Sequence, residues 1–269
     1  MENKWLRQPR GWVELFVLLN LGGLAPDIFL AHSVNTFRSR AEYIPLVFSL
    51  AAPVILLIGL WALSRGGMKL WRACGYLVGG LAVLVGMVGL MMHLQSQFFQ
   101  LWTIASLVYT APFAAPLAYT GLGLLLIMNR MVPDEKKEWA QWVIFFALGG
   151  FGGNFVFSLT DHAQNGFFHR VEWIPVISSA VAVGFLIMPL LVRAGKPYLF
   201  YCGLVMIVQM VVGAVGFILH ARADWESTGG NLFIRIVHGA PILAPTLFCD
   251  LAILAGIGLW ALGWGQAAE

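Results

Sequence analysis

A cassette of polar residues occurs twice in this chain and carries most of the side chains that could do chemistry. Its pattern, His-x-x-Asn-x-Phe-x-x-Arg-x-Glu-aromatic-Ile-Pro, spans residues 32–45 and again 162–175. Histidine exchanges protons near neutral pH, and a neighbouring carboxylate can relay those protons to water. Two copies of such a set in so apolar a chain indicate that these polar residues have a specific role.

Further repeats extend beyond the cassette. An apolar run ending in histidine recurs at a spacing of 127 residues, and Ala-Pro-x-x-Ala-Pro recurs at a spacing of 129, at 111–116 and 240–245. In the run, Val85, Gly86, Val88, Gly89 and His93 return as Val212, Gly213, Val215, Gly216 and His220. This period predicts two homologous helical units, 1–130 and 131–269.

The composition predicts an all-α integral membrane protein. Hydrophobic residues make up 59% of the chain and charged residues 11%, and the mean hydropathy is +0.81. A helix needs about 20 apolar residues to cross a bilayer. Eight runs meet this requirement, four in each half: 12–31, 43–63, 70–92, 104–128, 139–160, 174–192, 198–219 and 232–262.

Because four spans are an even number, the second half is expected to repeat the first in parallel, as two four-helix bundles. Of the 16 basic residues, 11 fall on the side of the predicted termini and 5 on the opposite side. The positive-inside rule then places both termini in the cytoplasm. The expected location is a bacterial cytoplasmic (inner) membrane. The net charge of +3 follows from this asymmetry and does not indicate nucleic acid as a partner.

The predicted spans put all six histidines near the outer ends of helices. If a helix continued through each cassette, its polar residues would lie on one narrow face at i, i+3, i+7 and i+10. Pro45 and Pro175 would then mark the first turn of the next helix. Residues in these stripes and at the same level are candidates for cofactor binding: His32, Asn35, His93, Tyr109, Asn165, His220 and His238.

The second half is richer in titratable groups. Asp161 stands where the first half has Ala31, and His169 where it has Ser39. We therefore expect any active centre in the second half, with the first half as its largely structural twin. The candidates for catalysis are Asp161, His162, His169 and Glu172. Acids within apolar runs are functional candidates because burying a charge is costly, and Asp27 and Asp250 join Asp161 in this class.

A quinone site is the first functional hypothesis. A quinone (menaquinone or ubiquinone) needs an apolar slot for its tail and protonatable groups at its carbonyls, which matches His, Asn, Tyr and acidic side chains at one membrane level. No motif in the chain could itself accept electrons. A partner redox subunit, an iron–sulfur protein or a cytochrome, is therefore expected.

Three segments resemble the NrfD/PsrC-type (polysulfide reductase) membrane subunits of respiratory complexes. They are Gly22-Gly23-Leu24-Ala25, His93-Leu94-Gln95-Ser96, and Tyr109-Thr110-Ala111-Pro112 with Pro116. The resemblance implies two four-helix bundles that present quinone at the outer face to an iron–sulfur subunit. The chain departs from that family in its clear internal repeat and in the adjacent pair Asp161-His162.

Two other ligand classes remain open. His32 with His93, and His162 with His220, could each be the axial ligands of one haem b per half. Alternatively, Asp161, His162, His169, His220 and His238 could ligate copper, iron or zinc in a membrane enzyme. A transporter is the remaining class, which the parallel repeats and the one-sided polar cluster favour less.

Overall fold

The computed structural model describes residues 8–95, 112, 114–134, 137–164 and 166–265, and these residues are helical apart from their connections. In this part of the chain, seven helices are long and apolar enough to cross a membrane. An eighth apolar helix, Leu117–Met131, is shorter. The predicted fourth span began at residue 104, and its first residues lie outside the described ranges.

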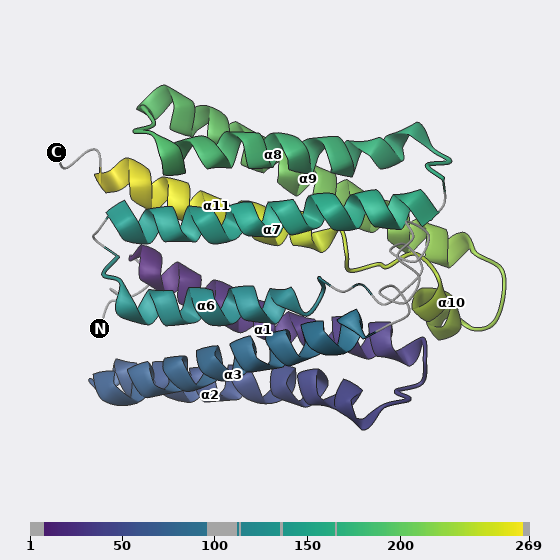
Figure 1. Ribbon diagram of the computed structural model, residues 1–269, viewed down its shortest axis with the longest axis horizontal. Coiled ribbons are helices and arrows are strands. Elements are labelled where there is room, and N and C mark those ends of the chain that lie inside the picture. The colour runs from purple at the N-terminus through teal and green to yellow at the C-terminus, as the bar shows by residue number, and fades with distance from the viewer. Residues whose placement is uncertain (1–7, 96–111, 113, 135–136, 165, 266–269) are drawn as a thin grey trace.

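The long helices form two groups in which each helix contacts its neighbours in a ring (Figure 1). The first group contains α1 (Pro9–Ser33), α2 (Tyr43–Ser64), α3 (Met68–Leu94) and α6 (Leu117–Met131). The second contains α7 (Lys137–Gln164), α8 (Trp173–Leu191), α9 (Lys196–Glu226) and α11 (Thr246–Gly265). The groups meet where α1 contacts α11 and α6 contacts α7. The predicted boundary at residue 130 falls in the last turn of α6.

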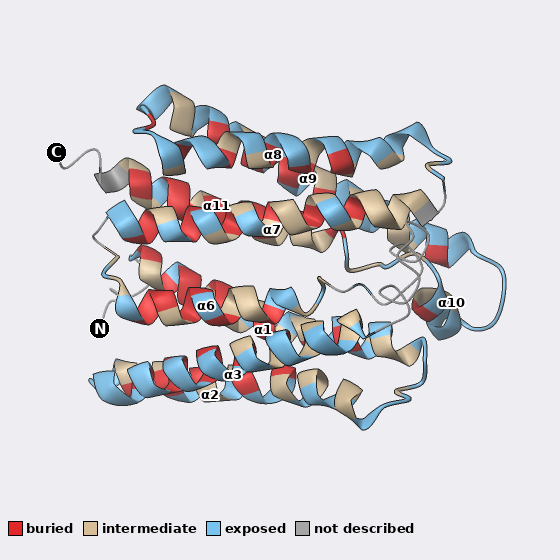
Figure 2. Cartoon of the chain, in the orientation of Figure 1, coloured by how far each residue is buried: buried red, intermediate tan, exposed pale blue. Residues whose placement is uncertain are grey.

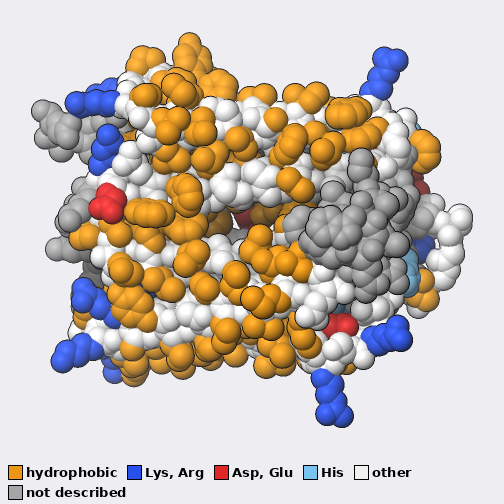
Figure 3. Space-filling view, in the orientation of Figure 1, with side chains coloured by type: hydrophobic (Ala, Val, Ile, Leu, Met, Phe, Trp, Pro, Cys, Tyr) orange, Lys and Arg blue, Asp and Glu red, His pale blue; other side chains and the backbone are white. Residues whose placement is uncertain are grey.

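The surface between the two ends is apolar, as expected for a lipid-facing protein. Hydrophobic side chains cover the sides of the visible face, whereas most lysines and arginines project at its two ends (Figure 3). Buried residues lie on the inward faces of the helices (Figure 2), where Val17, Leu56, Leu126, Phe151 and Ala255 are almost completely inaccessible. The predicted membrane-protein class agrees with this arrangement.

All described histidines belong to one end of the molecule, which we call the histidine end. It is the end at which α1, α3, α7 and α9 finish, on the right of Figure 1. α1 begins and α11 finishes at the other end, called here the opposite end.

The predicted last span, 232–262, is wrong as a single helix. A short helix α10 (Leu232–His238) lies at the histidine end, and α11 begins only at Thr246. Pro241 and Pro245 have no backbone N–H, so they interrupt the helix instead of only kinking it. Asp224 stabilises the break because its Oδ1 accepts a 2.8 Å hydrogen bond from the Ala240 amide.

The cassettes do not continue the preceding helix, which corrects the predicted stripe. α1 ends at Ser33, and Thr36 and Phe37 adopt positive φ angles of 57° and 51°. The chain reverses there, and the Phe37 amide donates to the His32 carbonyl at 3.1 Å. A short 3₁₀ helix, η2 (Arg40–Glu42), leads into α2, so Pro45 occupies the first turn of α2 as predicted.

The second cassette folds in the same way. Gly166 and Phe167 have φ angles of 64° and 54°, and the Phe167 amide donates to the His162 carbonyl at 3.1 Å. The 3₁₀ helix η3 (Arg170–Glu172) leads into α8. Both turns therefore return the glutamate of the cassette to the histidine that begins it.

Candidate functional site

The first candidate site joins three residues from three helical elements at the histidine end. Nδ1 of His32, near the end of α1, lies 3.3 Å from Oε2 of Glu42, the last residue of η2. The ring of His93, from α3, is 6.4 Å from the His32 ring between centroids and nearly perpendicular to it. His93 Nδ1 donates to the Pro112 carbonyl at 3.0 Å.

The second candidate site repeats this geometry. His162 Nδ1 lies 3.9 Å from Oε2 of Glu172, and the rings of His162 and His220 are 6.5 Å apart and nearly perpendicular. His220 Nδ1 donates to the Pro241 carbonyl at 3.0 Å. The first proline of each Ala-Pro-x-x-Ala-Pro motif therefore supplies the carbonyl that orients a site histidine.

Local packing explains why each glutamate returns to its histidine. Phe37 stacks on Tyr43 with ring centroids 4.6 Å apart, and Phe167 stacks on Trp173 at 4.0 Å. The phenylalanine that both cassettes share therefore anchors the start of the next helix. In the first cassette, Ser39 and Glu42 also form a reciprocal capping box around η2. Histidine occupies the Ser39 position in the second cassette and makes no such cap.

The hydrogen bonds fix how the site histidines can act. A carbonyl only accepts, so the hydrogen of a neutral His93 or His220 lies on Nδ1, and Nε2 is left as a proton acceptor or ligand atom. Oε2 of Glu42 and of Glu172 is buried and has no hydrogen-bond partner in the described part of the chain. Each site thus pairs two imidazoles with a carboxylate that can receive a proton from one of them.

The structure separates the predicted site residues into groups. His32, Glu42 and His93 come together, as do His162, Glu172 and His220, and Asp161 lies within electrostatic range of His220. Three candidates are exposed and apart from these contacts: Asn35 in the turn, His169 before η3, and His238 at the end of α10. Tyr109 and Asn165 lie outside the described residues.

This separation bears on the metal hypothesis. Within the residues described, no three His, Cys, Asp or Glu side chains converge as ligands of one ion. The exposure of His169 and His238 removes two of the five ligands that the hypothesis assigned. A multi-ligand metal centre therefore receives no support from the arrangement of these side chains.

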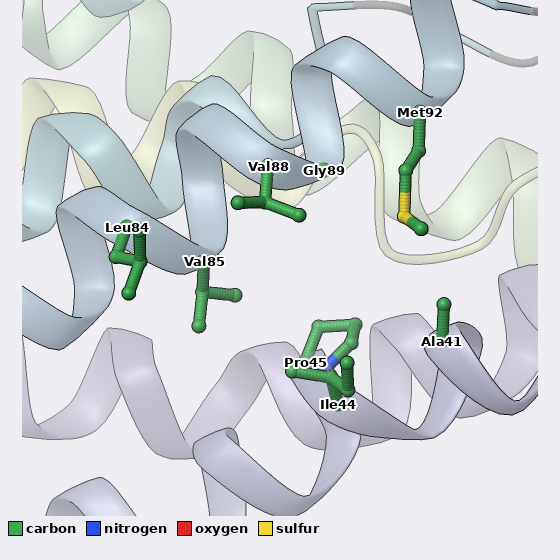
Figure 4. Close-up of a pocket in the computed structure, with 8 residues that line it drawn as sticks. All are labelled: Ala41, Ile44, Pro45, Leu84, Val85, Val88, Gly89 and Met92. Atoms are coloured by element: carbon green, nitrogen blue, oxygen red, sulfur yellow. The ribbon is translucent and has the colours of Figure 1, made fainter.

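An apolar recess of about 210 Å³ borders the first site (Figure 4). It lies between the start of α2 and the last part of α3, and it is lined by Ala41, Ile44, Pro45, Leu84, Val85, Val88, Gly89 and Met92. Ala41 precedes Glu42 in the chain and Met92 precedes His93. Two residues of the lining are therefore chain neighbours of residues in the first site.

Sequence reasoning missed a buried ion pair at the opposite end. Arg130 was counted among the basic residues beside the membrane, but its side chain is fully buried against Glu14. Glu14 lies inside the first apolar run, and an acid in that position was the available signal. Tyr119 was missed as well, and its hydroxyl joins Ser49 and the Pro45 carbonyl below the first site.

Comparisons with protein-family models, with curated proteins and with solved structures find no significant match. The geometry of the two sites therefore carries the functional argument.

Proposed function

We propose that this protein is a membrane-anchor subunit of a respiratory oxidoreductase complex that binds quinone or quinol at the histidine end. One observation carries the proposal: His32, Glu42 and His93 come together, and chain neighbours of Glu42 and His93 line an apolar recess. A quinone head group needs proton-exchanging side chains, and its isoprenoid tail needs an apolar slot. The first site offers both.

The side chains suit proton removal from a quinol. Oxidation of a quinol releases two protons and two electrons. Nε2 of His93 can take one proton from a hydroxyl, because Nδ1 of this ring already donates to Pro112. His32 can take the other and pass it through Glu42, 3.3 Å away, to water at the end of the bundle. The two electrons go to an iron–sulfur or cytochrome partner subunit.

The position of the recess favours the first half for the head group. The greater number of titratable groups favours the second half, where Asp161, His162 and Glu172 remain candidates. In the second half, Val171 and Leu219 occupy the positions of Ala41 and Met92. A recess at the corresponding place would therefore have a bulkier side chain at one end. Variants in both halves are needed to decide between them.

The proposed topology is eight spans in two parallel four-helix repeats, residues 1–130 and 131–269. The two closed rings of helices and the recurrence of the cassette turn support it. With 11 basic residues against 5, both termini would lie in the cytoplasm and the histidine end at the outer (periplasmic) face of a bacterial inner membrane. Lipid would contact the apolar sides.

Haem b is a second candidate, favoured by the separation of the histidine pairs. Metal–nitrogen distances of about 2 Å place two axial imidazoles with their centroids about 6 Å apart. The observed separations of 6.4 and 6.5 Å fit this requirement. His32 with His93, and His162 with His220, would hold one haem each, and haem iron would supply one-electron transfer. An absorption spectrum of the purified protein separates the candidates, because only a haem protein has a Soret band.

The quinone proposal is tested by binding. Protein reconstituted in nanodiscs is titrated with short-tailed ubiquinone and menaquinone, and co-purified quinone is extracted and measured. We expect His93→Ala and Glu42→Gln to weaken binding at least severalfold. His169→Ala is the matched control, because the side chain of this cassette histidine is exposed and makes no cap hydrogen bond.

Two outcomes would count against the proposal. Wild-type protein that binds neither quinone class excludes it outright. Unchanged binding in His93→Ala, with loss in His162→Ala and Asp161→Asn, would instead move the site to the second half.

A further inference from the structure

Two amide side chains inside the second helical group leave hydrogen-bonding groups unused. Asn154 of α7 is 3% exposed and Gln209 of α9 is 1% exposed. Nδ2 of Asn154 and Oε1 of Gln209 have no hydrogen-bond partner among the described residues. Gln209 is held in place through Nε2, which donates to the Ser178 carbonyl at 3.1 Å. One unused group is a donor and the other is an acceptor.

The first helical group has an apolar interior at the corresponding positions. The spacings of 130 and 127 residues align Asn154 with Leu24 and Gln209 with Ala82. In the same alignment, the buried Ser158 corresponds to Ile28. Polar groups in a membrane bundle are costly unless they are satisfied, so this difference between the groups calls for a ligand.

Contacts with α11 give the relative depths of the two amides. Gly150 of α7 packs against Leu251, and Gly213 of α9 packs against Phe248 and Cys249. α11 runs antiparallel to both helices. With a rise of 1.5 Å per residue, Asn154 and Gln209 differ in height by about 8 Å along the bundle. Asn154 and Gln209 each lie one turn from the glycine that packs against α11, so both are on the side of their helix that faces α11.

A polar face leads from these amides to the second candidate site. Asn154, Ser158 and Asp161 are spaced four and three residues apart on α7, so they lie on one face of the helix. Asp161 is within electrostatic range of His220, whose ring faces His162. The polar groups therefore continue from the interior to the histidine end.

Below Gln209 the interior is apolar and closed. Met206 and Cys202, one and two turns further along α9 toward the opposite end, are buried, as are Ala182 and Leu186 of α8. The Cys202 thiol already donates to the Phe185 carbonyl at 3.6 Å, and the side chains of Met206, Ala182 and Leu186 are apolar. The polar interior thus extends in one direction only.

We propose that the second helical group contains a water-filled half-channel that opens at the histidine end beside Asp161 and ends at Gln209. Water bonded to Asn154 Nδ2 and Gln209 Oε1 satisfies the two unused groups, since buried waters typically make about three hydrogen bonds. Asp161, seven residues nearer the histidine end of α7 than Asn154, lies where the half-channel opens. The half-channel does not depend on which ligand the histidine sites bind.

Radiolytic hydroxyl footprinting tests the inference on the unmodified protein. X-rays convert bound water into hydroxyl radicals that oxidise only the side chains next to it. Met206 is 3% exposed, so bulk radicals do not reach it, and it lies one turn from Gln209. We expect Met206 to be oxidised severalfold faster than Met128, the buried methionine of the first group. Equal rates for the two methionines would overturn the proposal.

A variant that carries the first-group residues provides the matched control. In Asn154→Leu/Gln209→Ala the excess oxidation of Met206 should disappear while that of Met128 stays the same. Thermal unfolding gives an independent sign. Removing groups that bind water should leave Tm unchanged or lower, whereas a raised Tm together with unchanged Met206 oxidation would show that the interior was dry.

Discussion

Arg130 and Glu14 form a two-pronged ion pair that is completely removed from solvent. Nη1 and Nη2 of Arg130 donate to the two carboxylate oxygens of Glu14 at 2.5 and 2.6 Å, and both side chains are 0% exposed. The guanidinium also lies 3.8 Å from the ring centroid of Trp71 and fills the space left by Gly75. The pair therefore ties α1 to α6 and packs them against α3.

The ion pair predicts a large effect for a single substitution. Glu14→Gln leaves the Arg130 charge buried without a counter-ion, and we expect a loss of about 3–5 kcal/mol in the free energy of unfolding. The second helical group offers the control, because Ile144 and Leu259 occupy the aligned positions. Glu14→Ile/Arg130→Leu should recover most of the loss. Unfolding in detergent, followed by circular dichroism, measures both, and equal stability of the single and double variants would contradict the argument.

The cassette turns predict opposite effects for an exchange at one position. Thr36 has a φ of 57°, and the aligned residue of the second turn, Gly166, has a φ of 64°. A left-handed conformation is unstrained for glycine and costs other residues about 1 kcal/mol. Thr36→Gly should therefore stabilise the protein by up to about 1 kcal/mol, and Gly166→Thr should destabilise it by a similar amount. The same sign in both unfolding experiments would refute this account.

Removing the buried hydroxyl of Tyr119 should have only a small effect on the free energy of unfolding. That hydroxyl bonds to Ser49 and to the Pro45 carbonyl. In the second group Phe248 replaces it, and Ser179 donates directly to the Pro175 carbonyl at 2.7 Å. Ser49 can adopt the same role, so Tyr119→Phe should cost less than about 1 kcal/mol, whereas Tyr119→Phe/Ser49→Ala should cost about 1–3 kcal/mol. If the effects of Tyr119→Phe and Ser49→Ala were simply additive, Ser49 would not be taking over the hydrogen bond of Tyr119.

Replacing Asp224 should loosen the attachment of α10. It is buried and accepts from the Ala240 amide, so Asp224→Ala leaves that amide without a partner. We expect faster proteolysis at residues 227–231 and a loss of about 1–3 kcal/mol. Glu226→Ala is the control, because its ion pair with Arg222 is exposed and worth about 0.5 kcal/mol or less. Comparable cleavage rates in the two variants would show that Asp224 does not hold α10 in place.

Hydropathy was sufficient for most of the fold. The apolar runs predicted the membrane class and the approximate limits of α1, α2, α3, α7, α8 and α9, because burial of a long helix in lipid requires a long apolar segment. The last span failed for a local reason. Its run of apolar residues continued through Pro241 and Pro245, although their missing amides end a helix.

The site was predictable in part. The repeat placed His32 and His93 of the first half, and His162 and His220 of the second, at the same level, and the rings of each pair do lie next to each other. His169 and His238 shared the same predicted level but are exposed. Membrane level alone does not determine whether a side chain points into a bundle or into solvent.

By itself, the sequence determined the apolar class of the protein, the places where helices form, and the residue types repeated in both halves, since these depend on local composition and periodicity. Only the tertiary structure decided which residues touch. Glu42 reaches His32 through a left-handed turn that helical periodicity does not foresee. Glu14 finds Arg130 from 116 residues away because α1 and α6 pack together. Such contacts depend on the close packing of several helices at once, and no local pattern encodes them.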